Sequence, residues 1–287
     1  MARASRIAAT LVALIVLLVA AAERSPADRD HRGRHGRHKV WPRLAYPQPR
    51  AIHRAEEYAA SRGAMAFAVI DRSIGLRGYE ADTQYSSASV SKALLLAAEL
   101  RRLERAGEPL DSATKAFLEP MITYSDNRSG DAIYARVGDA GLREVASRAG
   151  MRNFEPIPGF WGGDKVTAAD LARFFYRLDA AFPHRYRAYA KRLLAGITPV
   201  ERWGIPQAAG HGWSIGFKGG WRPPGEKNNS GPVTHQAALL VHQSGERLAL
   251  AVLTDEIPGA GGISAIEEIA RLLLSKPPPH RGGWATL

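Results

Sequence analysis

The chain has 287 residues, of which 45% are hydrophobic and 23% are charged, a composition typical of a globular protein with a large core. It contains no cysteine, which excludes disulfides, thiolate nucleophiles, thiolate metal sites and a cysteine-linked lipid anchor. The net charge of +11 is uneven: residues 1–22 carry +2 and residues 23–50 carry +5, which leaves +4 for residues 51–287. This distribution argues against nucleic-acid binding, which would need the excess on a folded face.

The N-terminus has the pattern of a targeting segment. Arg3 and Arg6 precede a stretch from Ile7 to Ala22 that is apolar apart from Thr10 and ends in small residues. The stretch is short for a helix that spans a bilayer. We therefore expect residues 1–22 to be a cleaved signal peptide or, as the alternative, a retained anchor. In both cases the rest of the chain would lie outside the cytoplasm, secreted or tethered to the membrane.

Residues 23–50 are rich in Arg, His, Asp, Gly and Pro and poor in apolar residues, so they cannot build a core. We expect a disordered basic linker that contacts an anionic envelope surface. Its three histidines fit a polar spacer better than a metal site. The folded domain is expected over residues 51–275, and residues 276–287, which begin with a proline run, form a flexible tail.

Periodicity and turn residues predict the elements of this domain in order. Strands are expected over residues 64–70, 76–80, 213–217, 237–242 and 248–255. Helices are expected over residues 51–62, from Ser89 to 106, and over 112–122, 127–137, 141–149, 167–181, 184–194 and 264–274. Strands thus lie near both ends, with an antiparallel hairpin in the last third, and helices fill the middle. This order predicts an α+β fold and not alternating βαβ units.

Two Ser-x-x-Lys patterns occur, Ser89 with Lys92 and Ser112 with Lys115. Residues i and i+3 share a helix face, so the amine can reach the hydroxyl and serve as its base. Ser89 starts the most apolar helix of the domain, where backbone N–H groups and the helix dipole favour a developing anion. Ser112 starts what reads as an ordinary surface helix. The sequence therefore favours Ser89 as the nucleophile.

Two further triplets follow at informative spacing. Ser125-Asp126-Asn127 begins 36 residues after Ser89, and Lys218-Gly219-Gly220 begins 93 residues after Ser125. A lysine can accept the proton of a serine only if its own positive charge is suppressed, and a second cation such as Lys218 helps to suppress it. We therefore expect Lys92 to titrate well below a free lysine.

Together the three elements resemble the penicillin-recognising serine enzymes, that is class A β-lactamases, penicillin-binding proteins and DD-peptidases. The resemblance covers roughly residues 51–274. It implies an α/β sandwich in which a five-stranded antiparallel sheet packs on helices, with a helical lobe beside it. It also implies an exported, monomeric serine hydrolase that forms an acyl-enzyme with β-lactams or related amides and esters. Such an enzyme would need no cofactor or metal, would take a small-molecule or peptidoglycan-derived substrate, and would serve β-lactam catabolism and antibiotic resistance.

The resemblance also implies a role for each matching residue. Ser89 would be the nucleophile and Lys92 its base or proton relay. Ser125 would pass a proton to the leaving nitrogen. Lys218 would polarise Ser125 and attract the carboxylate of the substrate. Asn127 would bind Lys92 and the amide on the acyl side of the substrate.

The oxyanion hole implied by the resemblance consists of the backbone N–H groups of Ser89 and Trp221. The residues beside the strand lysine depart from the family pattern. Gly219 replaces the usual hydroxyl residue, which removes one donor to the substrate carboxylate. Trp221 is bulky where small residues are common, so it narrows the cleft or stacks on a substrate. The resemblance implies that Gly219, Gly220 and Trp221, with Asn127 and Lys218, bind the substrate.

The residues for the step that releases the acyl group also depart from the family pattern. Class A enzymes use a glutamate with an asparagine four residues later. The corresponding segment here, 151–165, is shorter than in those enzymes and has no asparagine four residues after its glutamate. Glu155 is its only glutamate and is the candidate deacylating base, while Asp164 is a second carboxylate. Two alternatives follow: a DD-peptidase, penicillin-binding or esterase activity with slow β-lactam turnover, or a non-catalytic ligand-binding protein of the cell envelope.

A rival nucleophile is Ser214, in Gly212-Trp213-Ser214-Ile215-Gly216, which matches the Gly-x-Ser-x-Gly elbow of α/β-hydrolases. That elbow needs a buried strand before it and a helix after it. Here a Gly- and Ala-rich stretch precedes and the Lys218 triplet follows, so Ser214 is expected to be an ordinary strand residue.

Overall fold

The computed structural model of the chain describes residues 45–223, 231–257 and 259–275. The expected signal peptide, most of the expected linker and the C-terminal tail lie outside these described residues. The first helix, α1 (Pro49–Ala60), begins two residues before the expected start of the domain, because Pro49 occupies its first turn, where proline is favoured. Tyr46, expected in the linker, is buried and stacks on Trp213 with ring centroids 6.1 Å apart. The ordered domain therefore starts before residue 51.

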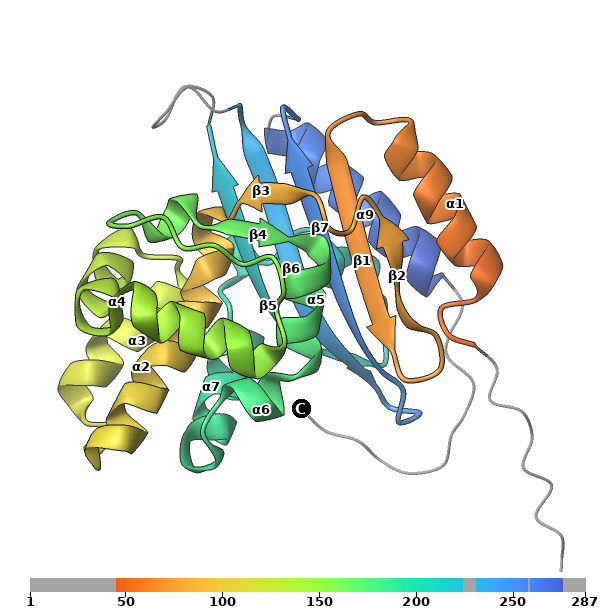
Figure 1. Cartoon of the computed structure of the whole chain (residues 1–287). Helices are drawn as coiled ribbons and strands as arrows, with labels where there is room; N and C mark the ends of the chain where they lie inside the picture. The colour runs from red at the N-terminus through yellow and green to blue at the C-terminus, as the bar shows by residue number, and fades with distance from the viewer. Residues whose placement is uncertain (1–44, 224–230, 258, 276–287) are drawn as a thin grey trace, which may run out of the picture. The chain divides into compact units, whose positions relative to one another are not determined.

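The centre of the domain is a five-stranded antiparallel sheet, as the sequence predicted (Figure 1). Its order is β2-β1-β7-β6-β5, so the strands near the two ends of the domain pair through β1 and β7. The five strands are β1 (Met65–Asp71), β2 (Gly75–Tyr79), β5 (Trp213–Arg222), β6 (Val233–His242) and β7 (Arg247–Asp255). β5 lies at the sheet edge next to the helices of the lobe. Its outward backbone groups are therefore not paired by a further strand of this sheet.

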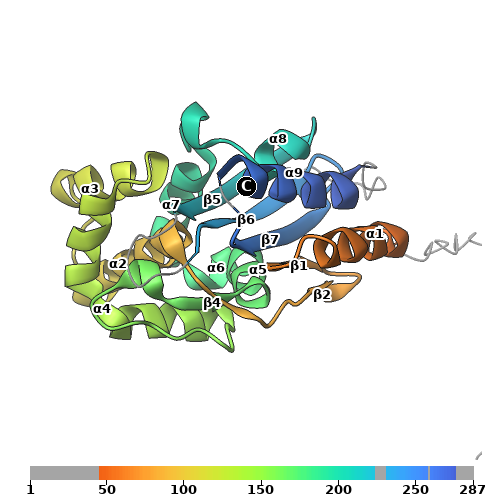
Figure 2. The ribbon, with the colours of Figure 1, turned by 90° about the horizontal axis from the view of Figure 1, so that it is seen from above.

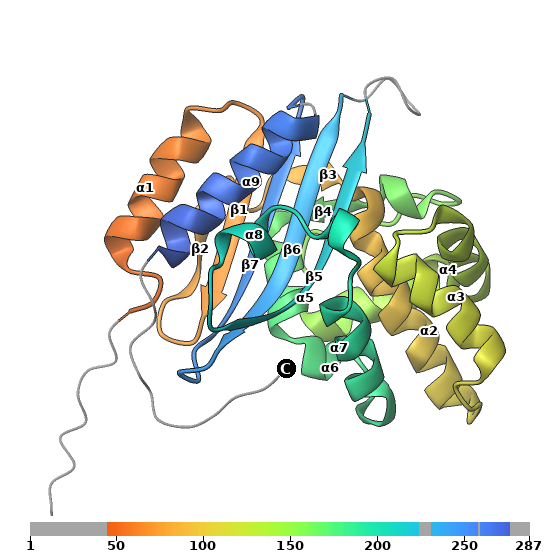
Figure 3. The same cartoon turned by 180° about the vertical axis from the view of Figure 1, so that it is seen from behind.

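Helices cover both faces of the sheet and form a lobe at its β5 edge (Figure 2). On one face α1 packs against α9 (Gly259–Leu274), with α8 (Ile205–Ala208) beside α9 (Figure 3). On the other face α5 (Ala168–Tyr176) crosses β1, β6 and β7, and α6 (Leu178–Ala181) follows it. The lobe consists of α2 (Lys92–Ala106), α3 (Ser112–Thr123) and α4 (Asn127–Ala149), and α7 (Arg187–Ala195) packs between α3 and β5.

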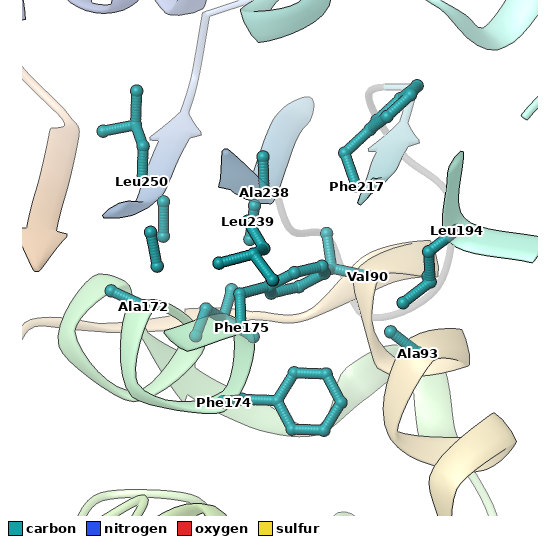
Figure 4. Close-up of a cluster of buried hydrophobic side chains, with 14 of the residues drawn as sticks. Val90, Ala93, Ala172, Phe174, Phe175, Leu194, Phe217, Ala238, Leu239 and Leu250 are labelled. Atoms are coloured by element: carbon teal, nitrogen blue, oxygen red, sulfur yellow. The ribbon is translucent and has the colours of Figure 1, made fainter. Parts of the chain in front are cut away.

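The core lies between the sheet and these helices (Figure 4). Phe174 and Phe175 of α5 meet edge to face, with centroids 5.3 Å apart, and are fully buried, with Leu239 of β6 next to Phe175. Val90 and Ala93, from the start of the lobe, enter the same cluster. The sheet and the N-terminal end of α2 therefore share one apolar core, which fixes the start of that helix against β5.

α4 (Asn127–Ala149) consists of two helical segments that meet at a kink at Gly138, whose φ of 56° and ψ of −174° are not helical. The sequence predicted two helices, over 127–137 and 141–149, and the kink at Gly138 lies between them. Two short strands were not expected, β3 (Gln84–Ser86) and β4 (Lys165–Thr167), which pair with each other. In the part of the chain that the structure describes, no helix combines the length and hydropathy needed to cross a membrane.

Candidate active site

Ser89 lies in η1 (Ala88–Ser91), a single 3-10 turn that leads directly into α2. The turn begins with Ala88 in a left-handed backbone conformation, with φ of 46°. Such a conformation is unfavourable for alanine and persists where the surrounding structure imposes it, most often at functional sites. Ser89 is partly exposed, while Val90 and Ser91 beside it are buried. The turn that precedes the buried helix thus leaves Ser89 partly exposed, while the α-helix itself begins three residues after Ser89, at Lys92.

Lys92 is the first residue of α2 and is completely buried. Its Nζ lies 3.0 Å from Ser89 Oγ and 2.7 Å from Asn127 Oδ1. It also donates to the backbone carbonyl of Ser125 and lies 3.4 Å from Ser125 Oγ. A lysine held by acceptors in this way points its amine at the serine hydroxyl, which is the geometry a proton acceptor needs.

Ser125 and Asn127 come from the junction between α3 and α4. Asp126 caps α4 by accepting a hydrogen bond from Ser129 N at 2.7 Å, so Asn127 is the first residue of the helix. Ser125 has a left-handed backbone with φ of 59°, a second non-glycine residue in this region beside the site. This turn directs the Ser125 hydroxyl toward both lysines.

Lys218 projects from the middle of β5 and is buried. Its Nζ lies 3.0 Å from Ser125 Oγ and 2.7 Å from the carbonyl of Gly219. The sequence placed a loop after Phe217, but β5 continues to Arg222, because residues 218–222 pair with residues 233–237 of β6. Glycines therefore occupy strand positions here and not a turn.

The two glycines after Lys218 allow close approaches on both faces of β5. A Cβ at Gly220 would lie 2.7 Å from Ser89 N and 2.8 Å from Val90 N. A Cβ at Gly219 would lie 2.8 Å from the ring of Trp203. The ring of Trp203 thus occupies the space into which a hydroxyl side chain at position 219 would project. β5 can run against the start of the Ser89 turn only because residue 220 has no side chain.

Burial lowers the pKa of both lysines. The pKa of Lys92 falls to about 8, because desolvation outweighs the attraction of Asp126, Glu201 and Asp131. The pKa of Lys218 falls to about 7 through desolvation and the neighbouring charge of Lys92. The lowered pKa of Lys92 agrees in direction with the expectation from the sequence, but its cause is desolvation and not the charge of Lys218. A fraction of Lys92 is therefore neutral near pH 7 and able to accept a proton.

Residues 161–164 lie directly against the turn Ala88–Ser91, here called the nucleophile turn after the candidate nucleophile Ser89. Ser87 donates its N–H to the carbonyl of Asp164 at 2.8 Å and its hydroxyl to the carbonyl of Trp161 at 3.1 Å. The Trp161 ring lies under Lys92, with Nζ 5.0 Å from the ring centroid, and its Nε1 donates to Asp131 at 2.8 Å. An aromatic face stabilises a nearby ammonium without accepting its proton. Sequence reasoning searched this segment for carboxylates and missed Trp161, whose signal was a tryptophan between glycines and aromatics.

The structure does not bring Glu155 into this cluster. Its main chain pairs with Lys165, and its side chain is exposed and does not line the pocket at Ser89. Asp164 is the carboxylate that the fold buries here. It accepts hydrogen bonds from Ile157 N at 3.0 Å and Ser91 Oγ at 3.5 Å, and burial raises its pKa to about 7. Asp164 ties the segment to the nucleophile turn and does not contact Ser89.

A pocket of about 180 Å³ opens beside Ser89. Its walls come from the nucleophile turn, α4, the segment 159–162 and the end of β5, and they comprise Ala88, Ser89, Asn127, Asp131, Gly159, Phe160, Trp161, Gly162, Trp221 and Arg222. Trp221 is 60% exposed, so it is a rim residue and not a plug. Within the described ranges, no group of three His, Asp or Glu side chains converges to hold a metal.

The other serines of the sequence analysis are elsewhere. Ser112 is an exposed residue at the start of α3. Ser214 lies inside β5 opposite Val241, so it is not on a strand-to-helix turn. The structure therefore gathers Ser89, Lys92, Ser125, Asn127, Lys218 and Gly220 at one place and leaves both alternatives outside it.

Comparison with known families decides the assignment of the fold. A family model described as "Beta-lactamase enzyme family" matches residues 109–276, which is more than half of the chain. The chain belongs to the beta-lactamase enzyme family. The match and the fold together place this family member among serine hydrolases of the β-lactamase fold, as the resemblance implied. No curated protein sequence matches it.

Solved structures agree on the fold of this beta-lactamase family member. A β-lactamase from Sphaerobacter thermophilus DSM 20745 is 18% identical, with a TM-score of 0.65 over 78% of this chain and 96% of that chain. A class A β-lactamase from Bacteroides cellulosilyticus DSM 14838 is 14% identical, with a TM-score of 0.69 over 80% of this chain and 98% of that one. The protein called PBP-A is 18% identical, with a TM-score of 0.65 and coverage of 78% and 94%. At these identities the similarity establishes the fold alone.

Proposed function

We propose that this protein is an exported serine hydrolase whose Ser89 attacks β-lactams or related amides and esters and forms an acyl-enzyme. The observation that carries the proposal is an unbroken chain of short contacts from Ser89 through Lys92 to Ser125 and Lys218. A buried lysine 3.0 Å from a serine at a helix start has the distance and direction of a general base, and its pKa of about 8 leaves a fraction of it neutral near pH 7. Export rests on the signal-like residues 1–22, and a monomer acting on a small-molecule or peptidoglycan-derived substrate is part of the proposal.

The first step is attack of Ser89 Oγ on the carbonyl carbon while its proton passes to neutral Lys92 Nζ. The carbonyl oxygen becomes an oxyanion, which the N–H groups of Ser89 and Trp221 would receive. A missing donor of this kind costs about 3–4 kcal/mol of transition-state stabilisation in other serine enzymes. The approach of β5 to Ser89 N, which Gly220 permits, sets the separation between these two donors.

The second step is loss of the leaving group. The C–N or C–O bond breaks, and the leaving atom takes the proton of Ser125 Oγ. Ser125 regains a proton from Lys92 or Lys218, whose Nζ atoms lie 3.4 Å and 3.0 Å from it. When Lys92 supplies it, the proton taken from Ser89 ends on the leaving group, Lys92 is neutral again, and the acyl group stays on Ser89 as an ester.

The positions of the carboxylates around Ser89 favour slow hydrolysis of the acyl-enzyme. Glu155 lies outside the cluster, and among the described residues Asp131 is the one carboxylate that lines the pocket. Asp131 already accepts the Trp161 Nε1 hydrogen bond. We therefore infer a long-lived acyl-enzyme, as in the penicillin-binding alternative, over fast β-lactam turnover.

The test is intact-protein mass spectrometry after mixing the exported form with benzylpenicillin. We expect an adduct of one penicillin mass on Ser89. This adduct should last much longer than one catalytic cycle of a fast β-lactamase. The variant S89A should show no adduct, and S112A and S214A should label like the wild type. Absence of any adduct with penicillins and fluorophosphonates would favour the non-catalytic envelope protein instead.

A further inference from the structure

Arg222, the last residue of β5, is a buried cation that has no carboxylate partner among the residues that the structure describes. It is 7% exposed, and its Nη1 donates to Ser86 Oγ at 2.9 Å. Its Nε and Nη2 are buried and have no hydrogen-bond partner in residues 45–223, 231–257 and 259–275. No ion pair with a carboxylate is formed by Arg222 within the described part of the chain. Buried arginines are normally paired with an anion, because an uncompensated buried charge is costly.

The nearby side chain of His235 is not a counter-ion for Arg222, because histidine is neutral or positively charged. His235 of β6 is fully buried, and its Nδ1 accepts the N–H of Thr254 at 3.1 Å while its Nε2 meets the carbonyl of Ser86 at 2.9 Å. Burial lowers the pKa of His235 to about 4, so the ring is neutral at physiological pH. Two donors of the guanidinium thus remain unused beside the pocket.

The position of the pocket shows which part of a substrate would meet Arg222. Arg222 and Ser89 line the pocket, and Ser125 and Lys218 do not. Ser125 is the group that would protonate the leaving atom, so the leaving group lies on the Ser125 side of Ser89. Because Ser125 does not line the pocket, the pocket would receive the acyl group, which remains on Ser89 after the bond has broken.

We propose that Arg222 is the anion-binding residue of an acyl-group subsite, so that preferred substrates carry a carboxylate on their acyl part. The inference rests on the proposed function, because that function defines the acyl side. On binding, the Arg222 side chain exchanges its single bond to Ser86 Oγ for a paired contact with the carboxylate through its unused donors. The exposed ring of Trp221 and the ring of Phe160 offer apolar surface to the rest of the acyl group.

Two penicillins that differ by one carboxylate on the acyl side chain provide the test: carbenicillin, which has it, and benzylpenicillin, which lacks it. Dissociation constants are measured by calorimetry in the S89A variant, which cannot be acylated. We expect carbenicillin to bind about tenfold or more tightly than benzylpenicillin, the size typical of a charge-assisted pair. The double variant S89A/R222Q should bind both equally, with its affinity for benzylpenicillin within about threefold of S89A.

The matched control is R128Q in the same background, because Arg128 is an exposed arginine beside Asn127 and should leave the preference intact. Retained benzylpenicillin affinity shows that R222Q is folded. Equal affinities in S89A, a preference that survives R222Q, or no binding of either penicillin would each overturn the inference. Failure of the proposed function is seen separately, as absence of acylation of the wild type while the preference in S89A persists.

Discussion

Gly220 of β5 lies so close to the backbone of Ser89 that a Cβ at position 220 would be 2.7 Å from Ser89 N. Real Cβ atoms do not come this near, so any side chain would push the strand away from the nucleophile turn. The strand would carry the N–H of Trp221 with it. The distance between the two groups proposed to bind the oxyanion thus depends on one missing methyl group.

The variant G220A should therefore lose acylation rate by at least tenfold and lose stability by about 1–3 kcal/mol, the usual cost of overpacking. The rate is measured with a chromogenic cephalosporin and the stability by urea denaturation. G216A on the same strand is the matched control, since its Cβ would meet Leu194 at an ordinary 3.5 Å. Equal effects at both positions would show that the approach of β5 to Ser89 is not special.

Acylation should depend on the hydroxyl of Ser125 and not on its strained backbone conformation. Its φ of 59° strains any residue with a Cβ, so S125G relieves strain while S125A does not. We expect both variants to lose about 10²–10³ in acylation rate, because the proton for the leaving group is gone. S125G should be at least as stable as the wild type in thermal unfolding. Acylation at the wild-type rate in S125G would exclude the relay.

The rate of acylation should rise with pH through a midpoint near 8. Lys92 accepts a proton only when neutral, and its pKa is lowered to about 8 by burial. Below this midpoint the rate should fall about tenfold per pH unit, since protonated Lys92 cannot act as base. The profile is measured by stopped flow, and an NMR titration of labelled lysine checks the assignment. A titration of Lys92 near the free value of 10.5 would contradict the mechanism.

Asp164 should make the protein less stable as the pH rises. Burial raises its folded pKa to about 7, whereas an unfolded aspartate titrates near 3.8. Protonated Asp164 therefore stabilises the fold fully below about pH 4, and this contribution is lost as pH rises toward 7. D164N keeps the acceptor for Ile157 N and removes the titration. It should match the wild type near pH 4 and exceed it by up to about 3 kcal/mol at pH 8.

Urea denaturation of D164N and wild type at both pH values measures this difference. S91A serves as a control, because it removes the Ser91 contact to Asp164 but leaves the carboxyl group to titrate. A pH dependence of stability that is the same in D164N and in the wild type would show that Asp164 is not its source.

Local patterns in the sequence were sufficient to predict the five strands of the sheet and the Ser89–Lys92 pair. The apolar run after Ser89 predicted a buried helix, and a serine at its start needs no tertiary information to be placed there. Lys92 follows by helix geometry, since i and i+3 share a face. Ser125 and Lys218 are brought in by tertiary structure, and only the family resemblance connected them to Ser89.

Other features could not be read locally. β3 and β4 have three residues each and no alternation, so their pairing depends on the chain folding back over almost eighty residues. The glycines after Lys218 read as a loop, but β6 supplies their hydrogen bonds. Glu155 has the residue type for a base, but its backbone is paired to Lys165 and its side chain is turned to solvent. Each difference comes from pairing with another segment of the chain.

Ala88 and Ser125 precede and follow Lys92 in the sequence, and both have left-handed backbones that glycine would adopt without strain. A screen for thermostability alone rewards replacement of both by glycine, because glycine removes the conformational penalty. At Ala88 such a gain leaves the chemistry in place. At Ser125 it removes a hydroxyl that lies between two lysines, so the variants ranked highest for heat resistance would include inactive ones.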